Sequence, residues 1–134
     1  MKKTIVLISI VFFLAGCTSS DQADLSDPLS SARGFIEASL KGDYNDAEKF
    51  MLSDSTNTQY LDGLRDFNKK LSPIERESYR DAEIIVDSTR SVNDSTDYIY
   101  YRNSYKKEPT KLKLIKRGND WKVDFKFTFI DETK

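Results

Sequence analysis

The sequence predicts an α+β fold in which N-terminal helices pack on one face of a curved four-stranded antiparallel sheet. Three observations predict it. Between residues 28 and 71, apolar side chains recur every three or four positions, as they do along one face of a helix. After residue 83 the apolar period becomes two, which is typical of strands with one buried face. The dipeptide Gly118-Asn119 separates two such segments and is a strong signal for a two-residue hairpin turn.

Residues 1–16 have the features of a secretory leader. Lys2 and Lys3 precede an apolar run, residues 5–14, that is too short to cross a hydrocarbon core of roughly 30 Å. The run closes with Leu14-Ala15-Gly16-Cys17, which resembles the lipobox of bacterial lipoproteins. The small residues before Cys17 give a membrane protease access to the backbone, and the thiol takes the lipid. Two alternatives remain open: a free thiol in a cut leader, and an uncleaved N-terminal membrane helix.

The lipobox resemblance implies a location in the cell. Acyl chains such as palmitate would be attached to Cys17, each buried methylene contributing about 0.8 kcal/mol to membrane binding. Residues 17–27 then form the lipidated cysteine and a flexible tether, because Thr18–Asp27 is polar and has no apolar period. Thr18, rather than an aspartate, follows the cysteine, and by resemblance this favours the outer membrane of the cell envelope over retention at an inner membrane.

Composition excludes several classes of function. Without residues 1–16, the basic count falls from 21 to 19 against 22 acidic residues, so the mature chain is mildly acidic and offers no basic stripe for nucleic acid. Histidine is absent, which removes the usual general base near neutral pH and the commonest metal ligand. We therefore expect neither a metal nor another cofactor. The only cysteine is Cys17, so the fold must be held by its core without an internal disulfide.

Residues 28–131 are expected to form one domain that starts with helices. Asp27 is placed as the N-cap of a first helix that begins with Pro28 and ends before Gly42. A second short helix should run from about Tyr44 to Leu52, with Asp43 as its cap and three inward side chains: Ala47, Phe50 and Met51.

A third helix follows from an apolar stripe with 4-3-4 spacing. Its members are Tyr60, Leu64, Phe67 and Leu71. Ser72-Pro73-Ile74-Glu75 has the pattern of a capping box with proline in the first helical position, which predicts a further helical turn.

Strands are predicted at residues 83–92, 97–105, 111–117 and 120–130, with a turn at Asn93-Asp94. A two-residue loop at Gly118-Asn119 sets the register of the last pair. The inner face then pairs Lys116 with Trp121, Leu114 with Val123, Leu112 with Phe125 and Thr110 with Phe127. The charged outer face pairs Lys113 with Asp124 and Arg117 with Asp120. The expected spine of the core is Trp121, Val123, Phe125, Phe127 and Phe129.

Two stretches of sequence carry a second resemblance. "ARGFIEASLKGDYNDAEKFM", within residues 28–52, is similar to the opening helices of nuclear transport factor 2-like (cystatin-like, cone-shaped) domains. "KLKLIKRGNDWKVDFKF" resembles their last hairpin. The residue triplet 42–44 and the segment 121–124 also resemble hallmarks of a group of small bacterial lipoproteins. Residues 54–81 match no part of this pattern.

The cone resemblance implies a ligand cavity between the first helix and the sheet. Aromatic residues would line its mouth, and Lys116 would stand opposite Trp121 as a polar handle; the aromatic set is Phe35, Tyr101, Trp121 and Phe125. The alternative is that these rings only fill the core. A further candidate is a basic, aromatic patch on the outer sheet face, which would dock a protein, an acidic glycan or lipid head groups: Tyr98, Tyr100, Arg102, Lys111, Lys113, Lys122 and Lys126.

These observations predict a non-enzymatic lipoprotein, with a binding or assembly role in the cell envelope. Its expected partners are the membrane, through the lipid, and an envelope protein or a small apolar ligand; nucleic acid is not expected. No catalytic residue is assigned. The alternative is a small isomerase- or hydrolase-like enzyme of the same fold, which would use a pocket tyrosine together with Asp43 or Asp124. The candidate tyrosines are Tyr98, Tyr100, Tyr101 and Tyr105.

Overall fold

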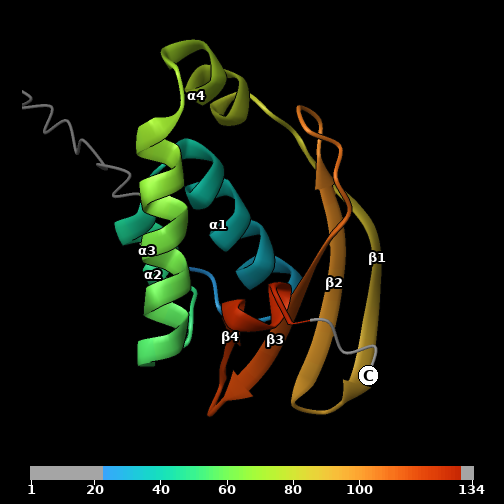
Figure 1. Cartoon of the computed structure of the whole chain (residues 1–134). Helices are drawn as coiled ribbons and strands as arrows, with labels where there is room; N and C mark the ends of the chain where they lie inside the picture. The colour runs from blue at the N-terminus through green and yellow to red at the C-terminus, as the bar shows by residue number, and fades with distance from the viewer. Residues whose placement is uncertain (1–22, 131–134) are drawn as a thin grey trace, which may run out of the picture.

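The computed structural model describes residues 23–130. Cys17, the leader and the first part of the tether lie outside the described residues, so lipidation and the flexibility of residues 17–22 stay predictions. Residues 23–130 contain no helix with the length and apolarity needed to cross a membrane. Four helices lie on one side of an antiparallel sheet, and a short 3₁₀ helix follows the last strand (Figure 1). The predicted α+β class is confirmed.

The first two helices begin where the caps predict. Helix α1 spans Pro28–Lys41, and the Asp27 carboxylate accepts a hydrogen bond of 2.9 Å from the Ser30 amide. Gly42 ends α1 with φ of 75°, a left-handed conformation that favours glycine. Helix α2 spans Tyr44–Lys49 and is capped by Asp43. It ends earlier than predicted because the next residues leave the helix to pair with the sheet.

Helices α3 and α4 form a second layer. Helix α3 spans Ser55–Lys70 and α4 spans Pro73–Arg80, whose capping box is complete in both directions. The predicted orientation of α3 is wrong in part. Leu61 is 2% exposed and is the residue of α3 that enters the core, whereas Phe67 of the predicted stripe is 48% exposed. Three members of the stripe, Leu64, Phe67 and Leu71, face the space between α3, α1 and α4 described below, and Tyr60 stacks on Phe129.

The four strands form an open meander, β1-β2-β3-β4 in order. They span Ile84–Asn93, Thr96–Asn103, Thr110–Arg117 and Asp120–Val123. The register of the last hairpin is confirmed near its turn: Lys116 lies opposite Trp121, Leu114 opposite Val123 and Arg117 opposite Asp120. Because the turn has two residues, as predicted, the inner and outer faces fall where the alternation placed them.

Strand β4 is shorter than predicted, and the pairings of Leu112 with Phe125 and of Thr110 with Phe127 are wrong. The Asp124 amide still donates to the carbonyl of its predicted partner Lys113 at 2.8 Å. The chain turns into a 3₁₀ helix, η1 (Phe125–Thr128), after Asp124. Asp124 was expected on the charged outer face but is 2% exposed. Its carboxylate accepts hydrogen bonds from the Asn57 amide at 2.9 Å and from the Lys126 ammonium at 2.6 Å. These buried bonds draw the backbone away from the sheet and toward the start of α3.

The end of the predicted core spine is also wrong. Phe127 is only half-buried, and the Lys113 ammonium lies 3.7 Å from its ring centroid. Phe129 is 55% exposed, although its ring stacks on Tyr60 at 4.8 Å. Once the chain leaves the strand, the period of two no longer decides which side chains face inward.

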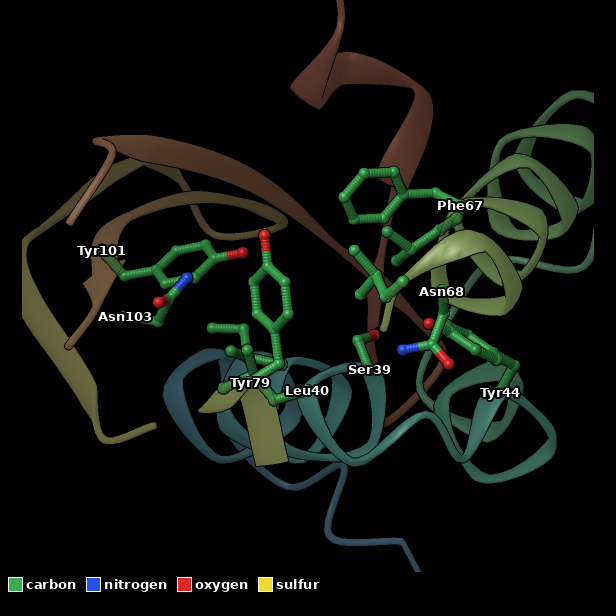
Figure 2. Close-up of a pocket in the computed structure, with 11 residues that line it drawn as sticks. Ser39, Leu40, Tyr44, Phe67, Asn68, Tyr79, Tyr101 and Asn103 are labelled. Atoms are coloured by element: carbon green, nitrogen blue, oxygen red, sulfur yellow. The ribbon is translucent and has the colours of Figure 1, made fainter. Parts of the chain in front are cut away.

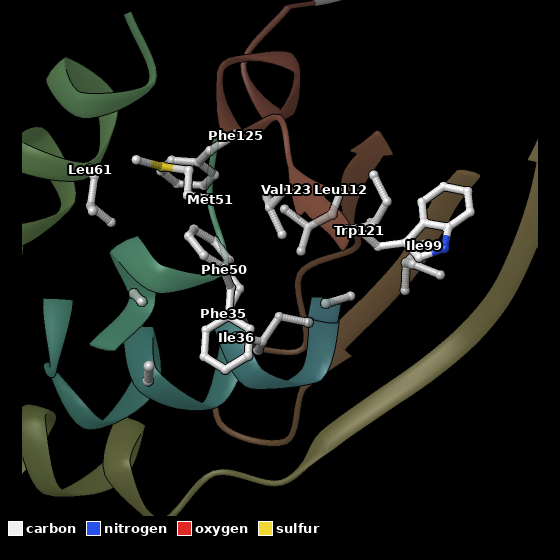
Figure 3. Close-up of a cluster of buried hydrophobic side chains, with 14 of the residues drawn as sticks. Phe35, Ile36, Phe50, Met51, Leu61, Ile99, Leu112, Trp121, Val123 and Phe125 are labelled. Atoms are coloured by element: carbon white, nitrogen blue, oxygen red, sulfur yellow. The ribbon is translucent and has the colours of Figure 1, made fainter. Parts of the chain in front are cut away.

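The core lies between α1, the α2–α3 segment and the inner face of the sheet (Figure 3). Phe35 packs against Phe125 with ring centroids 5.0 Å apart. The free edge of β4 is covered by other parts of the chain. The Val123 amide donates to the Phe50 carbonyl at 2.8 Å, and the Trp121 amide donates to the Leu25 carbonyl at 2.9 Å. Leu25 and Ala23 pack against the core, so contacts of the domain reach back before Pro28.

Candidate functional site

A pocket lies between α1, α3, α4 and β2, at the end of the sheet where the helices diverge from it (Figure 2). Its volume is about 160 Å³. The floor comes from α1, and one wall comes from α3 with Tyr44. The other wall is formed by Tyr79 of α4 and two residues of β2. The lining residues are Ile36, Ser39, Leu40, Tyr44, Leu64, Phe67, Asn68, Leu71, Tyr79, Tyr101 and Asn103.

Helix α1 presents the floor of the pocket. Ile36, Ser39 and Leu40 lie three and four positions apart, so their side chains project from one face of the helix. The Ser39 hydroxyl donates to the Phe35 carbonyl at 2.7 Å. That bond uses the only hydrogen of the hydroxyl, so its oxygen is left to act as an acceptor on the pocket floor.

Helix α3 supplies the apolar wall. Leu64, Phe67 and Leu71 line the pocket and belong to the stripe that the sequence predicted. Asn68 lies between them and carries the amide nearest Ser39 in Figure 2. The stripe thus has the predicted helical spacing, but only its first two members, Tyr60 and Leu64, pack against the core, and Leu64, Phe67 and Leu71 line the cavity.

Helix α4 contributes a single ring. None of its residues is buried, and Tyr79 projects into the space between β2 and α3 (Figure 2). The Tyr79 ring meets Phe67 edge-on at 6.4 Å and Tyr105 edge-on at 5.0 Å. These aromatic contacts connect α4 to helix α3 and to the loop after β2. Tyr79 is therefore both a wall of the pocket and the contact through which α4 is docked.

Strand β2 adds Tyr101 and Asn103, which share the inner face because they are two positions apart. The Asn103 side-chain oxygen accepts hydrogen bonds from the amides of Tyr105 at 3.1 Å and Lys106 at 2.8 Å. Those bonds fix the orientation of the side chain, whose nitrogen end points toward Tyr79 in Figure 2. The pocket therefore receives an amide donor from this strand.

The pocket is electrically neutral. None of its eleven lining residues is an aspartate, glutamate, lysine or arginine. Burial raises the pKa of Tyr101 to about 12 and also raises the pKa values of Tyr44 and Tyr79. The three phenols stay protonated at neutral pH. The site offers apolar contacts, hydroxyl groups and amides, and these groups can hold a neutral molecule but cannot accept a proton in general base catalysis at that pH.

Only one predicted ligand-binding residue lines this pocket. Tyr101 does, whereas Phe35 and Phe125 pack together in the core, at 2% and 5% exposure. Trp121 is 8% exposed and belongs to the same core, with the Lys116 ammonium 5.9 Å from its ring. Lys116 is exposed at the opposite end of the sheet. The structure does not bring the five predicted ligand-binding residues together. Three of their four aromatic rings are buried in the core, where α1 packs on β3, β4 and η1.

The residues considered for the enzyme alternative lie apart as well. Asp43 caps α2, accepting a hydrogen bond from the Asp46 amide at 3.1 Å. Asp124 is held in the buried cluster with Asn57 and Lys126. Neither lines the pocket that contains Tyr101. Within residues 23–130, no three aspartate, glutamate, cysteine or histidine side chains gather where they would hold a metal ion.

Sequence reasoning missed most of the pocket. Phe67, Asn68, Tyr79 and Asn103 were not singled out as site residues. The sequence of α3 held one indication of the pocket. Phe67 and Leu71 continue the apolar stripe past Leu64, toward the end of the helix, where the core no longer covers it. No pattern in the sequence indicated that Tyr79 would contact Phe67 of this stripe. That contact depends on the direction in which α4 leaves the loop at Leu71.

The described fold and pocket define a class: a single α+β domain whose helices, together with an open antiparallel sheet, enclose a neutral aromatic pocket. Comparisons with protein-family models, with curated proteins and with solved structures give no match.

Proposed function

We propose that this protein is a lipid-anchored cell-envelope protein whose domain binds a small neutral, ring-containing molecule in the pocket between α1, α3, α4 and β2. The observation that carries the binding role is the lining of that pocket: apolar and aromatic side chains with three phenols and two amides, and no carboxylate or ammonium group. In our proposal the domain binds its ligand without transforming it.

The anchor is supported by the sequence. The positive residues Lys2 and Lys3, the short apolar run and the segment Leu14-Ala15-Gly16-Cys17 stand in the order that lipoproteins require. Acyl chains on Cys17 would hold the domain at the membrane, and Thr18 after the cysteine supports the outer membrane as the location.

Kinship with the nuclear transport factor 2-like domains is part of the proposal. It is supported by the order of elements, helices first and then a four-stranded meander, and by helices that cover one face of the sheet. The sheet is also irregular in β1, where the register with β2 shifts after Val86 and after Ser91. Such shifts bend and twist a strand, as a cone-shaped sheet requires.

The size of the pocket sets the class of ligand. Apolar cavities of about 150 Å³ in proteins admit a benzene-sized ring, and this pocket has about 160 Å³. A charged ligand would lose its hydration without meeting an opposite charge. A neutral ring with one or two polar substituents meets both the rings of Phe67 and Tyr79 and the polar groups of Ser39 and Asn103.

A calorimetric titration tests the binding role. The neutral probe benzyl alcohol has one ring and one polar substituent, as the pocket requires, and we expect saturable binding to the protein. Replacing Ser39 by leucine fills the pocket floor and should weaken binding at least about tenfold, since roughly 1.4 kcal/mol of lost contact corresponds to that factor.

Ser78→Leu is the matched control. Ser78 donates to the Ile74 carbonyl at 2.9 Å, as Ser39 does to Phe35, but does not line the pocket. Binding to this variant should equal binding to the parent. Equal loss in both variants, or no saturable binding to the parent at all, would contradict the proposed pocket. Turnover of a neutral ester or ketone that is abolished by Tyr101→Phe would favour the enzyme instead.

A further inference from the structure

The face of the sheet that points away from the helices carries an ordered set of cations. Three rows cross the strands at this face: Arg90, Tyr98 and Lys113; Ser88, Tyr100 and Lys111; Thr96, Ile115 and Lys122. Residues directly opposite one another in an antiparallel sheet share a face. We call this surface the basic face and define it by its seven charged or apolar members: Arg90, Tyr98, Tyr100, Lys111, Lys113, Ile115 and Lys122.

The alternation of the strands confirms which way the basic face points. Ile99, Leu112 and Leu114, which lie between members of the rows, are at most 1% exposed and belong to the core. Their neighbours along each strand must therefore point to the opposite side. In Figure 1 the helices α1 and α3 lie on the core side, and no helix covers the other side of the sheet.

Charge is segregated on this face. The three rows hold four cations and no carboxylate. Among the described residues, carboxylates flank the face at its two ends, each beside an arginine: Asp87 is 2.7 Å from Arg102, and Asp120 lies opposite Arg117. The Lys122 ammonium also donates to the Lys49 carbonyl at 2.6 Å. The chain as a whole has more acidic than basic residues. The basic face thus runs against the overall charge, and electrostatics make it complementary to an anionic surface.

The cations are set among rings. The Lys113 ammonium lies 3.7 Å from the centroid of Phe127, and the Lys111 ammonium lies 5.1 Å from that of Tyr98. Lysine stems and tyrosine rings are amphipathic, with apolar bodies and polar ends, and such side chains are enriched where a protein meets the head-group region of a bilayer. A broad sheet face of this composition fits an extended anionic surface better than a small ligand.

The position of the chain's start adds a geometric argument, which rests on the proposed lipid anchor. Six residue steps separate Cys17 from Ala23, the first described residue, and they span roughly 20 Å at full extension. Leu25 is then bonded to Trp121 of β4, the neighbour of Lys122. An acylated Cys17 would therefore bring the bilayer near the edge of the sheet that carries Lys122.

From these observations we propose that the basic face docks on the anionic head groups of the membrane that holds the lipid anchor. The sheet lies against the bilayer, and the helical layer with its pocket faces away from it. Each cation close to an anionic leaflet strengthens binding about fivefold, so the four cations orient a domain that the lipid alone would leave free to tumble.

The test uses the acylated protein reconstituted on vesicles. One set is phosphatidylcholine alone, and the other contains roughly one-third phosphatidylglycerol. A water-soluble amine-acetylating reagent labels exposed lysines, and mass spectrometry gives the rate for each one. We expect Lys113 and Lys122 to react about fivefold more slowly on the anionic vesicles. Lys69 and Lys106, which are exposed on α3 and on the loop after β2, should react equally on both sets.

A pair of matched variants checks the origin of that protection. Lys113→Gln with Lys122→Gln removes two charges from the basic face, and Lys69→Gln with Lys70→Gln removes two from α3. On the anionic vesicles, the slower acetylation of Lys111 should disappear in the variant of the basic face and persist in the α3 variant. It should also vanish for the parent at high salt, where the screening length falls to about 4 Å. Circular dichroism identifies any variant that has lost its fold.

The outcomes separate this proposal from the proposed anchor. Equal labelling rates on both vesicle sets, for a protein that pellets with both, would contradict the docking and leave the anchor intact. A protein that pellets with neither set would contradict both. Protection that appears only when a soluble acidic polysaccharide is added would assign the basic face to a glycan and overturn the membrane proposal.

Discussion

Gly34 and Gly63 lie in helices with opposite steric surroundings, so the same substitution should change stability in opposite directions. A Cβ on Gly34 would lie 2.3 Å from two ring carbons of Phe50, and Phe50 is only 7% exposed. A Cβ on Gly63 would meet no atom within 4 Å. Gly34 is thus required for the close approach of α1 to the segment after α2, whereas Gly63 only loosens α3.

We therefore expect Gly34→Ala to lower the free energy of unfolding by about 1–3 kcal/mol, as overpacked cores do. Gly63→Ala should raise it by about 0.5–1 kcal/mol, because alanine is the better helix former. Urea denaturation of the two variants measures both effects. A stabilised Gly34→Ala variant would show that the α1–Phe50 contact is looser than the structure has it.

Asn57 connects the start of α3 with the segment that follows β4. Its amide group donates to Asp54 at 2.7 Å and to Asp124 at 2.9 Å, and its oxygen accepts from the Lys126 amide at 2.8 Å. The side chain is fully buried. This residue explains why the chain leaves β4 after Val123: the buried Asp124 carboxylate needs a donor, and α3 provides it.

Asn57→Ala should cost about 3 kcal/mol, since it removes one of the two side-chain donors of the buried Asp124 carboxylate and leaves the Lys126 amide without its partner. Asn45→Ala, at an exposed position of α2, should change stability by less than about 0.5 kcal/mol. Thermal unfolding followed by circular dichroism compares the two. Equal effects would mean that water replaces the Asn57 bonds at no cost.

At the scale of the element, three helices begin with an acidic cap. Hydrogen bonds from Ser30 hold the pKa of Asp27 below its usual 3.8, and the amide of Asn57 does the same for the pKa of Asp54. A carboxyl whose pKa is lower in the folded state releases its proton more readily there. Its contribution to stability is present above the unfolded pKa, near 3.8, and is lost as the pH falls through the folded value.

We therefore expect the free energy of unfolding to decrease between pH 5 and pH 3. The double variant Asp27→Asn with Asp54→Asn should show a weaker decrease, because asparagine caps a helix without titrating. Urea denaturation across this pH range measures the slope. A variant that keeps the full pH dependence would place its origin in other groups.

Helix α4 illustrates how an element can be locally well specified and yet weakly held. Its capping box is complete, but none of its residues is buried and Ile74 is 77% exposed. The ring of Tyr79 packs edge-on against Phe67 of α3 and against Tyr105, and so helps to hold α4 on the domain. Because Tyr79 also lines the pocket, docking of α4 and occupancy of the pocket are physically connected.

At the scale of the whole molecule, the proposed anchor and the proposed docking on the membrane depend on one sulfur atom. Cys17→Ser should abolish acylation and move the protein from the membrane fraction to the soluble or unprocessed fraction, because two or three acyl chains anchor a protein where none would hold it. Intact mass spectrometry of the membrane fraction should show the lipid on the parent. Unchanged membrane retention of the variant would contradict the anchor.

Much of the fold could be predicted because its signals are local. Caps at Asp27, Asp43 and Ser72, the glycine at position 42 and the turn at Gly118-Asn119 each act within a few residues, and the structure has all of them. The candidate site could not be predicted in the same way. Of the five residues chosen for it, only Tyr101 lines the pocket. Large aromatic residues serve cores and pockets alike, and composition does not separate the two uses.

The sequence alone determined the α+β class, the starts of α1, α2 and α4, and the last hairpin near its turn. The leader and its cysteine stay predictions. Only the tertiary structure decided that Asp124 is buried, that β4 stops at Val123 and that the α3 stripe lines a cavity with Tyr79. The physical reason is the distance along the chain over which each interaction acts. Capping and turn formation depend on neighbours in sequence, whereas the Asn57–Asp124 bond joins residues 67 positions apart.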